Sequence, residues 1–229
     1  MDFHVLDEEI ATPSGPMMNL LLVAVKRDEL YPLIEVFQAA SLQIEFIDID
    51  ALACINALEF FYPESLKTSI GVLDIGTEIS TLSIMREGKP RFIRDVSYGG
   101  LDILKRLKRK LGLSDQAALE QLEVDRLPSP EAIEVLKEGL ANLVAELKVS
   151  LDYYLDQVHP SEPVTKLYLG GGGGYHPIVL ETLTKELGFG VETIDILSKI
   201  KLGDGVDQEG VKKNQGLLAV ALGLCLRDS

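Results

Sequence analysis

The sequence contains no tryptophan and, among 229 residues, only two cysteines and three histidines. Cys54 and Cys225 lie far apart in apolar segments, so we expect buried free thiols of a reducing compartment rather than a disulfide framework. The histidines, His4, His159 and His176, share no metal-ligand spacing with the cysteines or with one another. This scarcity argues against a zinc site.

Positive charge is scarce as well, because 22 lysines and arginines face 36 acidic residues and the net charge is −14. Binding to nucleic acid or to anionic lipid needs a basic surface, so the composition argues against both partners. The longest apolar runs, such as Leu20 to Val25, are too short to cross a bilayer, and the acidic N-terminal segment has no signal-peptide core. We therefore expect a soluble, cytoplasmic protein that does not insert into the membrane.

Hydrophobic residues make up 46% of the chain, enough for the cores of one large or two small domains. The most informative segment is residues 70–100. Its apolar runs and its Glu87-Gly88 hairpin signal predict three consecutive strands, at Ile70–Leu73, Ser80–Met85 and Lys89–Val96.

The turn after the first of these strands has the residues to receive an anion. Gly76 lets a ligand approach the backbone, and successive N–H groups there can form a cup for a phosphate. Asp74, at the end of the strand, is placed to hold a metal-bound water. Thr77, Ser80 and Thr81 add hydroxyl donors. An ordinary β-meander with a glycine turn is the alternative interpretation of this segment alone.

A second glycine-rich turn follows the predicted strand Lys166–Leu169. Gly170 to Gly174 are consecutive glycines, and Tyr175-His176-Pro177 opens a helix. A strand, glycines and a helix in this order bring backbone N–H groups and a helix N-terminus to a nucleotide. Ordering five glycines is entropically costly, which suggests that something approaches this backbone closely.

The remaining segments predict further elements. We expect a buried strand at 19–25 and a second strand at 43–49 around a helix at 28–40, which together form a βαβ-like unit. Further helices are expected at 51–61, 100–111, 114–123, 130–159 and 216–226, and another strand at 191–196. The small residues of 216–226 favour close packing of that helix against the sheet.

The predicted helix 100–111 carries a basic side, made by Lys105, Arg106, Lys108, Arg109 and Lys110. Cations suit the C-terminal end of a helix, which Gly112 closes. We interpret this side as a solvated face, and contact with an anionic partner is the alternative.

The two glycine turns, in this order and at this separation, resemble those of the actin-like ATPase family, an α/β, ribonuclease H-like fold. DIGTEIST at 74–81 is similar to the second phosphate loop of that family, and Leu169–Gly172 to its adenosine loop. Within the family, the segments 146–154 and 219–226 resemble the PilM proteins of type IV pilus assembly, with FtsA as a more distant relative. The resemblance covers nearly the whole chain.

This resemblance implies a domain organisation. Residues 1–50 correspond to a partial 1C-like α/β subdomain, 51–69 to a connecting helix, and 70–229 to a complete second domain (2A/2B) with both loops. No strand-turn-strand with a first phosphate loop precedes Leu20, so we expect the first domain to be largely missing from an N-terminally truncated chain.

The resemblance also implies ATP with Mg²⁺ as the ligand, with Asp74 beside the metal. The implied nucleotide-binding residues are Asp74, Gly76, Thr77, Thr81, Gly99, Gly100, Glu146, Ser150, Gly170, Gly171, Gly172 and Gly173. A nucleotide held by one wall of a cleft keeps much solvent contact and lacks the preorganised surroundings that hydrolysis requires. We therefore expect weak ATP binding and at most weak ATPase activity, without catalytic residues.

The implied function is that of a scaffold in type IV pilus assembly that is peripheral to the inner membrane and binds the cytoplasmic N-terminal tail of a PilN-like protein. Homo-oligomerisation is a further expectation. The alternatives are an FtsA-like division protein, a type II secretion platform protein and an actin-like module that does not bind nucleotide. A Rossmann-type enzyme is a more distant alternative, because a G-x-G-x-x-G pattern that starts at Gly170 ends on Tyr175.

Overall fold

A computed structural model describes residues 1–12, 15–123, 126–158 and 161–227. The chain forms two compact units, Met1–Ile49 and Asp50–Ser229. The unit boundary falls just before a helix that the sequence predicts, α2 (Asp50–Phe61). The expected end of the long helix at His159 lies outside the described residues.

The first unit is a hairpin followed by a helix. Strands β1 (Asp2–Thr12) and β2 (Gly15–Val23) pair antiparallel, with irregular register between Val5 and Ile10, and α1 (Arg27–Ala39) follows. The helix agrees with the prediction to within a residue. The strand expected at 43–49 is wrong, since these residues form no strand, and the unit is therefore not βαβ.

The expected burial of segment 19–25 is also wrong. A two-stranded sheet and one helix leave most apolar side chains of this unit accessible, and α1 has no buried residue. The exposed large apolar side chains of β1, β2 and α1 are Phe3, Val5, Met17, Met18, Leu20, Leu22, Tyr31, Leu33, Val36 and Phe37.

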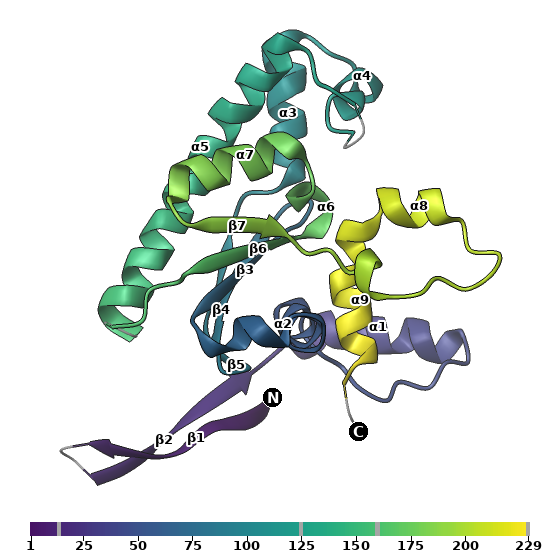
Figure 1. The fold of residues 1–229 in the computed structure, drawn as a ribbon. Coiled ribbons are helices and arrows are strands. Elements are labelled where there is room, and N and C mark those ends of the chain that lie inside the picture. Colours follow the sequence, from purple (N-terminus) through teal and green to yellow (C-terminus); the bar gives the residue numbers. More distant parts are fainter. Residues whose placement is uncertain (13–14, 124–125, 159–160, 228–229) are drawn as a thin grey trace. The chain divides into compact units, whose positions relative to one another are not determined.

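The second unit is built on a five-stranded sheet in the order β5-β4-β3-β6-β7 (Figure 1). Three strands form an antiparallel meander, β3 (Ile70–Ile75), β4 (Ser80–Arg86) and β5 (Lys89–Val96). On the other side of β3, β6 (Lys166–Gly170) and β7 (Gly190–Thr193) run parallel to it. The Glu87-Gly88 hairpin is confirmed, because both residues have the positive φ values, 53° and 73°, of the tight turns that match strand twist.

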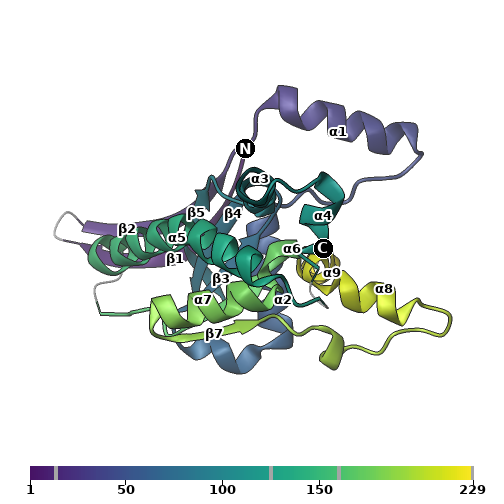
Figure 2. The same cartoon turned by 90° about the horizontal axis from the view of Figure 1, so that it is seen from above.

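Helices cover both faces of this sheet. Alternate residues of β3 point to opposite faces, so Leu73 joins the core beneath α3 (Gly100–Leu111), α5 (Pro130–Tyr153) and α7 (Pro177–Leu187), whereas Val72 joins the core beneath α2. Figure 2 shows α5 and α7 side by side on the first of these faces. The second unit is therefore a three-layered structure, in agreement with the α/β class that the sequence predicts.

Short helices complete the second unit. Ser114 caps α4 (Asp115–Glu120) through its hydroxyl, and α5 continues into a π-helical turn, Tyr154–Val158. The glycine loop is itself a helical turn, α6 (Gly171–Gly174). The other elements are Pro63–Lys67, Leu197–Lys199 and Gln215–Leu217 (3₁₀ turns), α8 (Gln208–Lys213) and α9 (Leu218–Cys225). None of the helices in the described part of the chain is long and apolar enough to span a bilayer.

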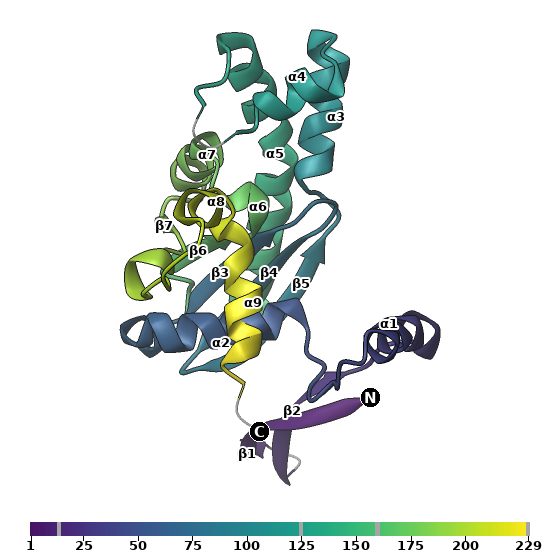
Figure 3. The same cartoon turned by 90° about the vertical axis from the view of Figure 1, so that its right-hand side faces the viewer.

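The closing helix α9 packs mainly on helix α2, and its residue Ala219 joins the core that α2 shares with strands β3 and β6. Figure 3 shows α9 crossing α2, and the small residue Gly223 permits the crossing because its backbone lies against the carbonyl group of Ala53. Both cysteines are free thiols. Cys54 on α2 is buried, but Cys225 at the end of α9 is exposed, which corrects the prediction for that residue.

The crossing of α2 and α9 predicts the effect of a single methyl group. A Cβ atom at position 223 would overlap the carbonyl oxygen of Ala53, so we expect Gly223→Ala to lower the free energy of unfolding by at least about 2 kcal/mol in urea denaturation. Gly203→Ala is the matched control, because no atom lies within 4 Å of the added Cβ, and we expect a change within about 0.5 kcal/mol. Equal effects of the two substitutions would contradict this account of the packing.

Candidate nucleotide-binding site

The two glycine turns predicted from the sequence meet at one place in the structure. In the parallel pair β3–β6, Asp74 lies opposite Gly170, so the carboxyl ends of both strands open at the same edge of the sheet. Gly171 has a φ of +73°, and a Cβ atom there would come within 2.5 Å of the Asp74 Oδ1 atom. Glycine is required here both by the backbone conformation and by the close approach of the two turns.

The first turn is held by the N-terminus of α3. The Gly76 N–H donates to the Ile79 carbonyl group at 3.1 Å, which closes the turn. The Gly76 and Thr77 carbonyl groups then accept hydrogen bonds from the N–H groups of Gly100 (3.0 Å) and Leu101 (2.8 Å). The turn is thus fixed by backbone contacts at both of its ends.

This arrangement uses the carbonyl groups of the turn and leaves donors available. Within the described residues, the backbone N–H groups of Thr77 and Glu78 make no hydrogen bond. Both residues are exposed. Two consecutive free N–H groups beside a glycine can form a concavity suited to an anion.

Asp74 lies at the end of a polar row across three strands. It is the register partner of Thr81 on β4, which in turn is the partner of Asp95 on β5. The Thr81 hydroxyl donates to Asp95 Oδ1 at 2.8 Å, and not to Asp74. Burial raises the pKa of the Asp74 carboxyl above its usual value, and the nearby charge of Asp50 raises it further. A cation would relieve both effects.

The residues around Asp74 can hold a Mg²⁺ ion that is also bound to the phosphates of a nucleotide, but not a Mg²⁺ ion bound by protein ligands alone. No group of three or more His, Cys, Asp or Glu side chains with metal-site geometry occurs among the residues that the structure describes. Mg²⁺ keeps several waters, however, and binds to proteins through one or two carboxylates together with substrate phosphates. A half-buried Asp74 beside free backbone donors meets that requirement, whereas a metal site made of protein ligands alone does not.

Two of the predicted site residues are placed elsewhere, and we correct them. Ser150 is fully buried, and its hydroxyl donates to the carbonyl group of Glu146 at 2.7 Å, so it cannot contact a ligand. The Glu146 carboxylate pairs with Arg94 on edge strand β5 at 3.0 Å. The following turn, at Tyr154, contacts Ser69 at the start of β3, which is the opposite end of that strand from Asp74.

The other predicted residues occupy the two turns or their immediate supports. Gly99 lies beneath the first turn, where a Cβ atom would come within 2.5 Å of the Thr77 carbonyl oxygen. In the second turn Gly170, Gly171 and Gly173 pack against β3, while Gly172 is exposed. The backbone of Gly172 is therefore accessible to a ligand, whereas the neighbouring glycines allow the turn to pack closely against β3.

Gly216 lies beside this site, although the sequence did not predict it as a site residue. A Cβ atom at Gly216 would overlap the Gly171 carbonyl oxygen, so the segment before α9 presses on the second turn. Next to it, Leu217 is exposed and its side chain is 4.0 Å from a Cβ atom built on Gly172. The small residues of segment 216–226 were the available signal, but they were assigned to packing against the sheet.

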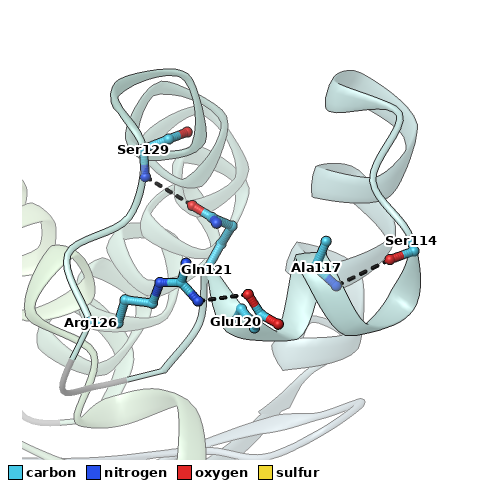
Figure 4. A network of polar contacts seen from close by, with 6 residues as sticks. All are labelled: Ser114, Ala117, Glu120, Gln121, Arg126 and Ser129. Atoms are coloured by element: carbon cyan, nitrogen blue, oxygen red, sulfur yellow. Dashed lines mark hydrogen bonds and ion pairs between the residues drawn. The ribbon is translucent and has the colours of Figure 1, made fainter.

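A polar network joins α4 to the start of α5 (Figure 4). The Gln121 side-chain oxygen accepts the Ser129 N–H at 2.8 Å, and Arg126 pairs with Glu120 at 2.6 Å. Ser129 also caps α5 through its hydroxyl, which accepts the Ala132 N–H. These contacts tie the end of α4 to the start of α5.

A model of the protein family described as "Type IV pilus assembly protein PilM" matches residues 1–229 of the chain. Among solved structures, a "PilM-PilN type IV pilus biogenesis complex" is similar with a TM-score of 0.80 and 26% sequence identity. That match covers 99% of this chain and 65% of the PilM chain, so this chain spans slightly less than two thirds of the PilM length.

More distant structures share the fold. The ethanolamine utilization protein EutJ from Carboxydothermus hydrogenoformans is similar with a TM-score of 0.64 and 18% identity, over 89% of this chain and 62% of EutJ. MreB5 of Spiroplasma citri, in a structure with bound ADP, is similar with a TM-score of 0.59 and 13% identity, over 89% of this chain and 65% of MreB5. These matches confirm the expected actin-like fold.

The environment of Asp74 predicts a pH-dependent cost of folding. Because its folded-state pKa is raised, the carboxyl favours the folded state at acid pH, and this contribution is lost as pH rises from the unfolded value of 3.8 through the folded pKa. We expect Asp74→Asn to be more stable than the wild type at pH 7 in the absence of ligand, with a smaller difference at pH 4. Urea denaturation at the two pH values measures this.

Glu78→Gln is the control for the loss of one negative charge, because Glu78 is on the same turn but exposed. A stability difference for Asp74→Asn that is the same at both pH values would mean that Asp74 ionises freely in the folded protein.

Proposed function

Because the chain belongs to the family of type IV pilus assembly proteins PilM, we propose that it is a scaffold of the pilus machinery that binds ATP with Mg²⁺ and the cytoplasmic N-terminal tail of a PilN-like protein. In this proposal it is cytoplasmic and is held at the inner membrane through that partner. Residues 1–50 act as the 1C-like subdomain, 51–69 as the connecting segment and 70–229 as the nucleotide-binding domain.

The observation that carries nucleotide binding is the meeting of the two glycine turns at Asp74. The free N–H groups of Thr77 and Glu78 would receive the phosphates, and Asp74 would hold the Mg²⁺ ion, directly or through water. The bound metal would supply charge neutralisation for the phosphates. The exposed backbone at Gly172 and the side chain of Leu217 would contact the nucleoside part.

The proposed site is a place for binding and not for rapid hydrolysis. Asp74 belongs to no group of three or more His, Cys, Asp or Glu side chains that could hold a metal in the described residues, and one wall of backbone leaves the phosphates in contact with water. Hydrolysis depends on donors that are fixed around the transition state in water-excluded surroundings. ATP is thus proposed as a structural or regulatory ligand.

The proposed binding surface for a PilN-like tail is the apolar surface of the first unit. Its strands and helix expose apolar side chains over most of their length, among them Leu20, Leu22, Leu33 and Val36. Apolar patches of this extent mark surfaces that bind another polypeptide. The solved PilM structure that the chain resembles contains PilN as its partner, which supports a tail of that kind as the ligand.

Calorimetric titration with Mg²⁺ and ATP tests the nucleotide site. We expect binding by the wild type, and an affinity reduced more than tenfold, about 1.4 kcal/mol, by Asp74→Ala or by Gly171→Val, which pushes a side chain into the Asp74 carboxylate. Gly188→Asn is the matched control, because it changes another glycine of positive φ with open space around it. If folded protein gives no binding heat and does not compete for a fluorescent ATP analogue, the proposal of nucleotide binding is refuted. The chain would then be an actin-like module that does not bind nucleotide.

Fluorescence anisotropy with a labelled peptide of a PilN-like cytoplasmic tail tests the partner. We expect Leu22→Ser with Val36→Ser to weaken binding about tenfold or more, because both side chains are exposed on the apolar surface of the first unit. Val149→Ser removes an equally exposed valine from the second unit and is expected to have no effect.

The peptide titration is made with the 229-residue chain and with the same chain joined to the first domain of a PilM protein. Absence of binding in both forms would refute the assignment of the partner, whatever the result for ATP.

A further inference from the structure

A polar pocket of about 340 Å³ lies between α3 and α5. It opens beside Ser97 and Tyr98, at the end of edge strand β5, whereas Asp74 lies on β3. Tyr98 belongs to the core beneath α3 and α5, while Asp74 alternates with Leu73 and faces the side of the sheet that carries α2. The pocket therefore lies on the other face of the sheet from Asp74.

Two buried hydrogen-bond donors at the inner end of this pocket lack acceptors. The Tyr98 hydroxyl and the Arg106 Nε–H are both inaccessible to water, and neither has a hydrogen-bond partner in the described part of the chain. They lie close together, since a Cβ atom on Gly139 of α5 would be 3.0 Å from the Tyr98 oxygen and 3.9 Å from Arg106 Nε. Burying a donor without an acceptor costs free energy. Two neighbouring unpaired donors therefore indicate a place where an acceptor can bind.

The hydroxyl of Tyr98 is held in its donating form. Burial, followed by the charge of Asp102, raises the pKa of Tyr98 to about 12, and the Arg106 charge offsets only part of this. The Asp102 carboxylate, which also lines the pocket, accepts the Gly99 N–H at 3.0 Å at the N-terminus of α3 and accepts from neither of the two donors. The acceptors that line the pocket therefore leave both donors unsatisfied in the described part of the chain.

Unpaired cations stand at the rim of the pocket. Lys105 and Arg109 are exposed and, among the described residues, make no ion pair. The other cations of the same helix have partners, since Lys108 pairs with Asp115, and Arg106 and Lys110 pair with Glu138. Like charges four residues apart on a helix repel each other, so an anion between Lys105 and Arg109 would relieve their repulsion.

The remaining wall of the pocket adds neutral polar groups. Asn142 on α5 and Ser97 after β5 line it together with the cations. An excess of positive charge, a guanidinium group and several hydrogen-bond donors are the chemistry that recognises a multiply charged oxyanion. In a chain with a net charge of −14, a pocket of this composition stands apart from its surroundings.

We propose that the pocket between α3 and α5 binds a phosphate-type oxyanion, either inorganic phosphate or the phosphate group of a monoester. Lys105 and Arg109 contact the anion from the rim, and Asn142 donates to it from α5. The anion reaches Arg106 and Tyr98 by a small movement of the Arg106 side chain. Because both helices contribute, the bound anion fixes α3 against α5.

Thermal unfolding in millimolar sodium phosphate, against sodium chloride of equal ionic strength, tests this proposal. A ligand that binds only the folded state stabilises it by mass action, and we expect the Tm of the wild type to rise saturably, by roughly 3–6 °C at tenfold excess over the dissociation constant. The double variant Lys105→Ala, Arg109→Ala is expected to lose this rise. Its own Tm without phosphate reports whether it is folded.

Two controls separate the pocket from general charge effects and from the nucleotide site. Lys108→Ala with Lys110→Ala removes the same charge from the same helix, and Asp74→Ala alters the other site; both are expected to keep the rise. Equal losses in the two double variants would reveal diffuse electrostatics and overturn the proposal. So would loss of the rise in Asp74→Ala alone, or a wild type without a saturable response. Phosphoserine in place of phosphate identifies the source, because a stronger response assigns a monoester and a weaker one assigns the free ion.

Discussion

Strands β3 and β6 are far apart in the sequence but run side by side in parallel, with Asp74 opposite Gly170. Parallel neighbours need a long crossover, which here consists of the β4–β5 hairpin and helices α3, α4 and α5. Because the ladder is parallel, the turns that follow both strands open at the same edge. Asp74, the free donors of the first turn and the glycines of the second are neighbours only as a consequence of this pairing. Asp74 is the one charged side chain among these groups, and the remaining groups are backbone atoms whose positions depend on this strand pairing.

The sequence predicts the second unit well because its local signals agree with its packing. The apolar run of β3, the Glu87-Gly88 turn and the Ser114 cap each specify one conformation that the tertiary structure also requires. The first unit shows the reverse case. Segment 43–49 alternates like a strand but forms none in the structure. A strand forms only where another strand is available to pair with it, and the local sequence pattern does not show whether such a partner exists.

The candidate site was predictable in its glycines and not in its helix residues. Glycine at 76, 99 and 171 reports a close approach of backbones, and the structure places contacts at each position. Glu146 and Ser150 share a helix face, as their spacing implies, but Leu143, Leu147 and Ser150 follow one buried stripe of α5. The apolar spacing therefore already indicated that Ser150 faces the core. Sequence spacing shows which residues share a face, whereas packing decides where that face points.

Hydrogen–deuterium exchange with and without Mg²⁺ and ATP tests the central claim most directly, because the claim is that two distant turns form one site. The account predicts that the amides of segments 74–79 and 170–174 slow their exchange together and over the same range of nucleotide concentration, while unit Met1–Ile49 does not respond. Protection of one turn without the other, or of neither at concentrations where nucleotide is bound, would contradict it.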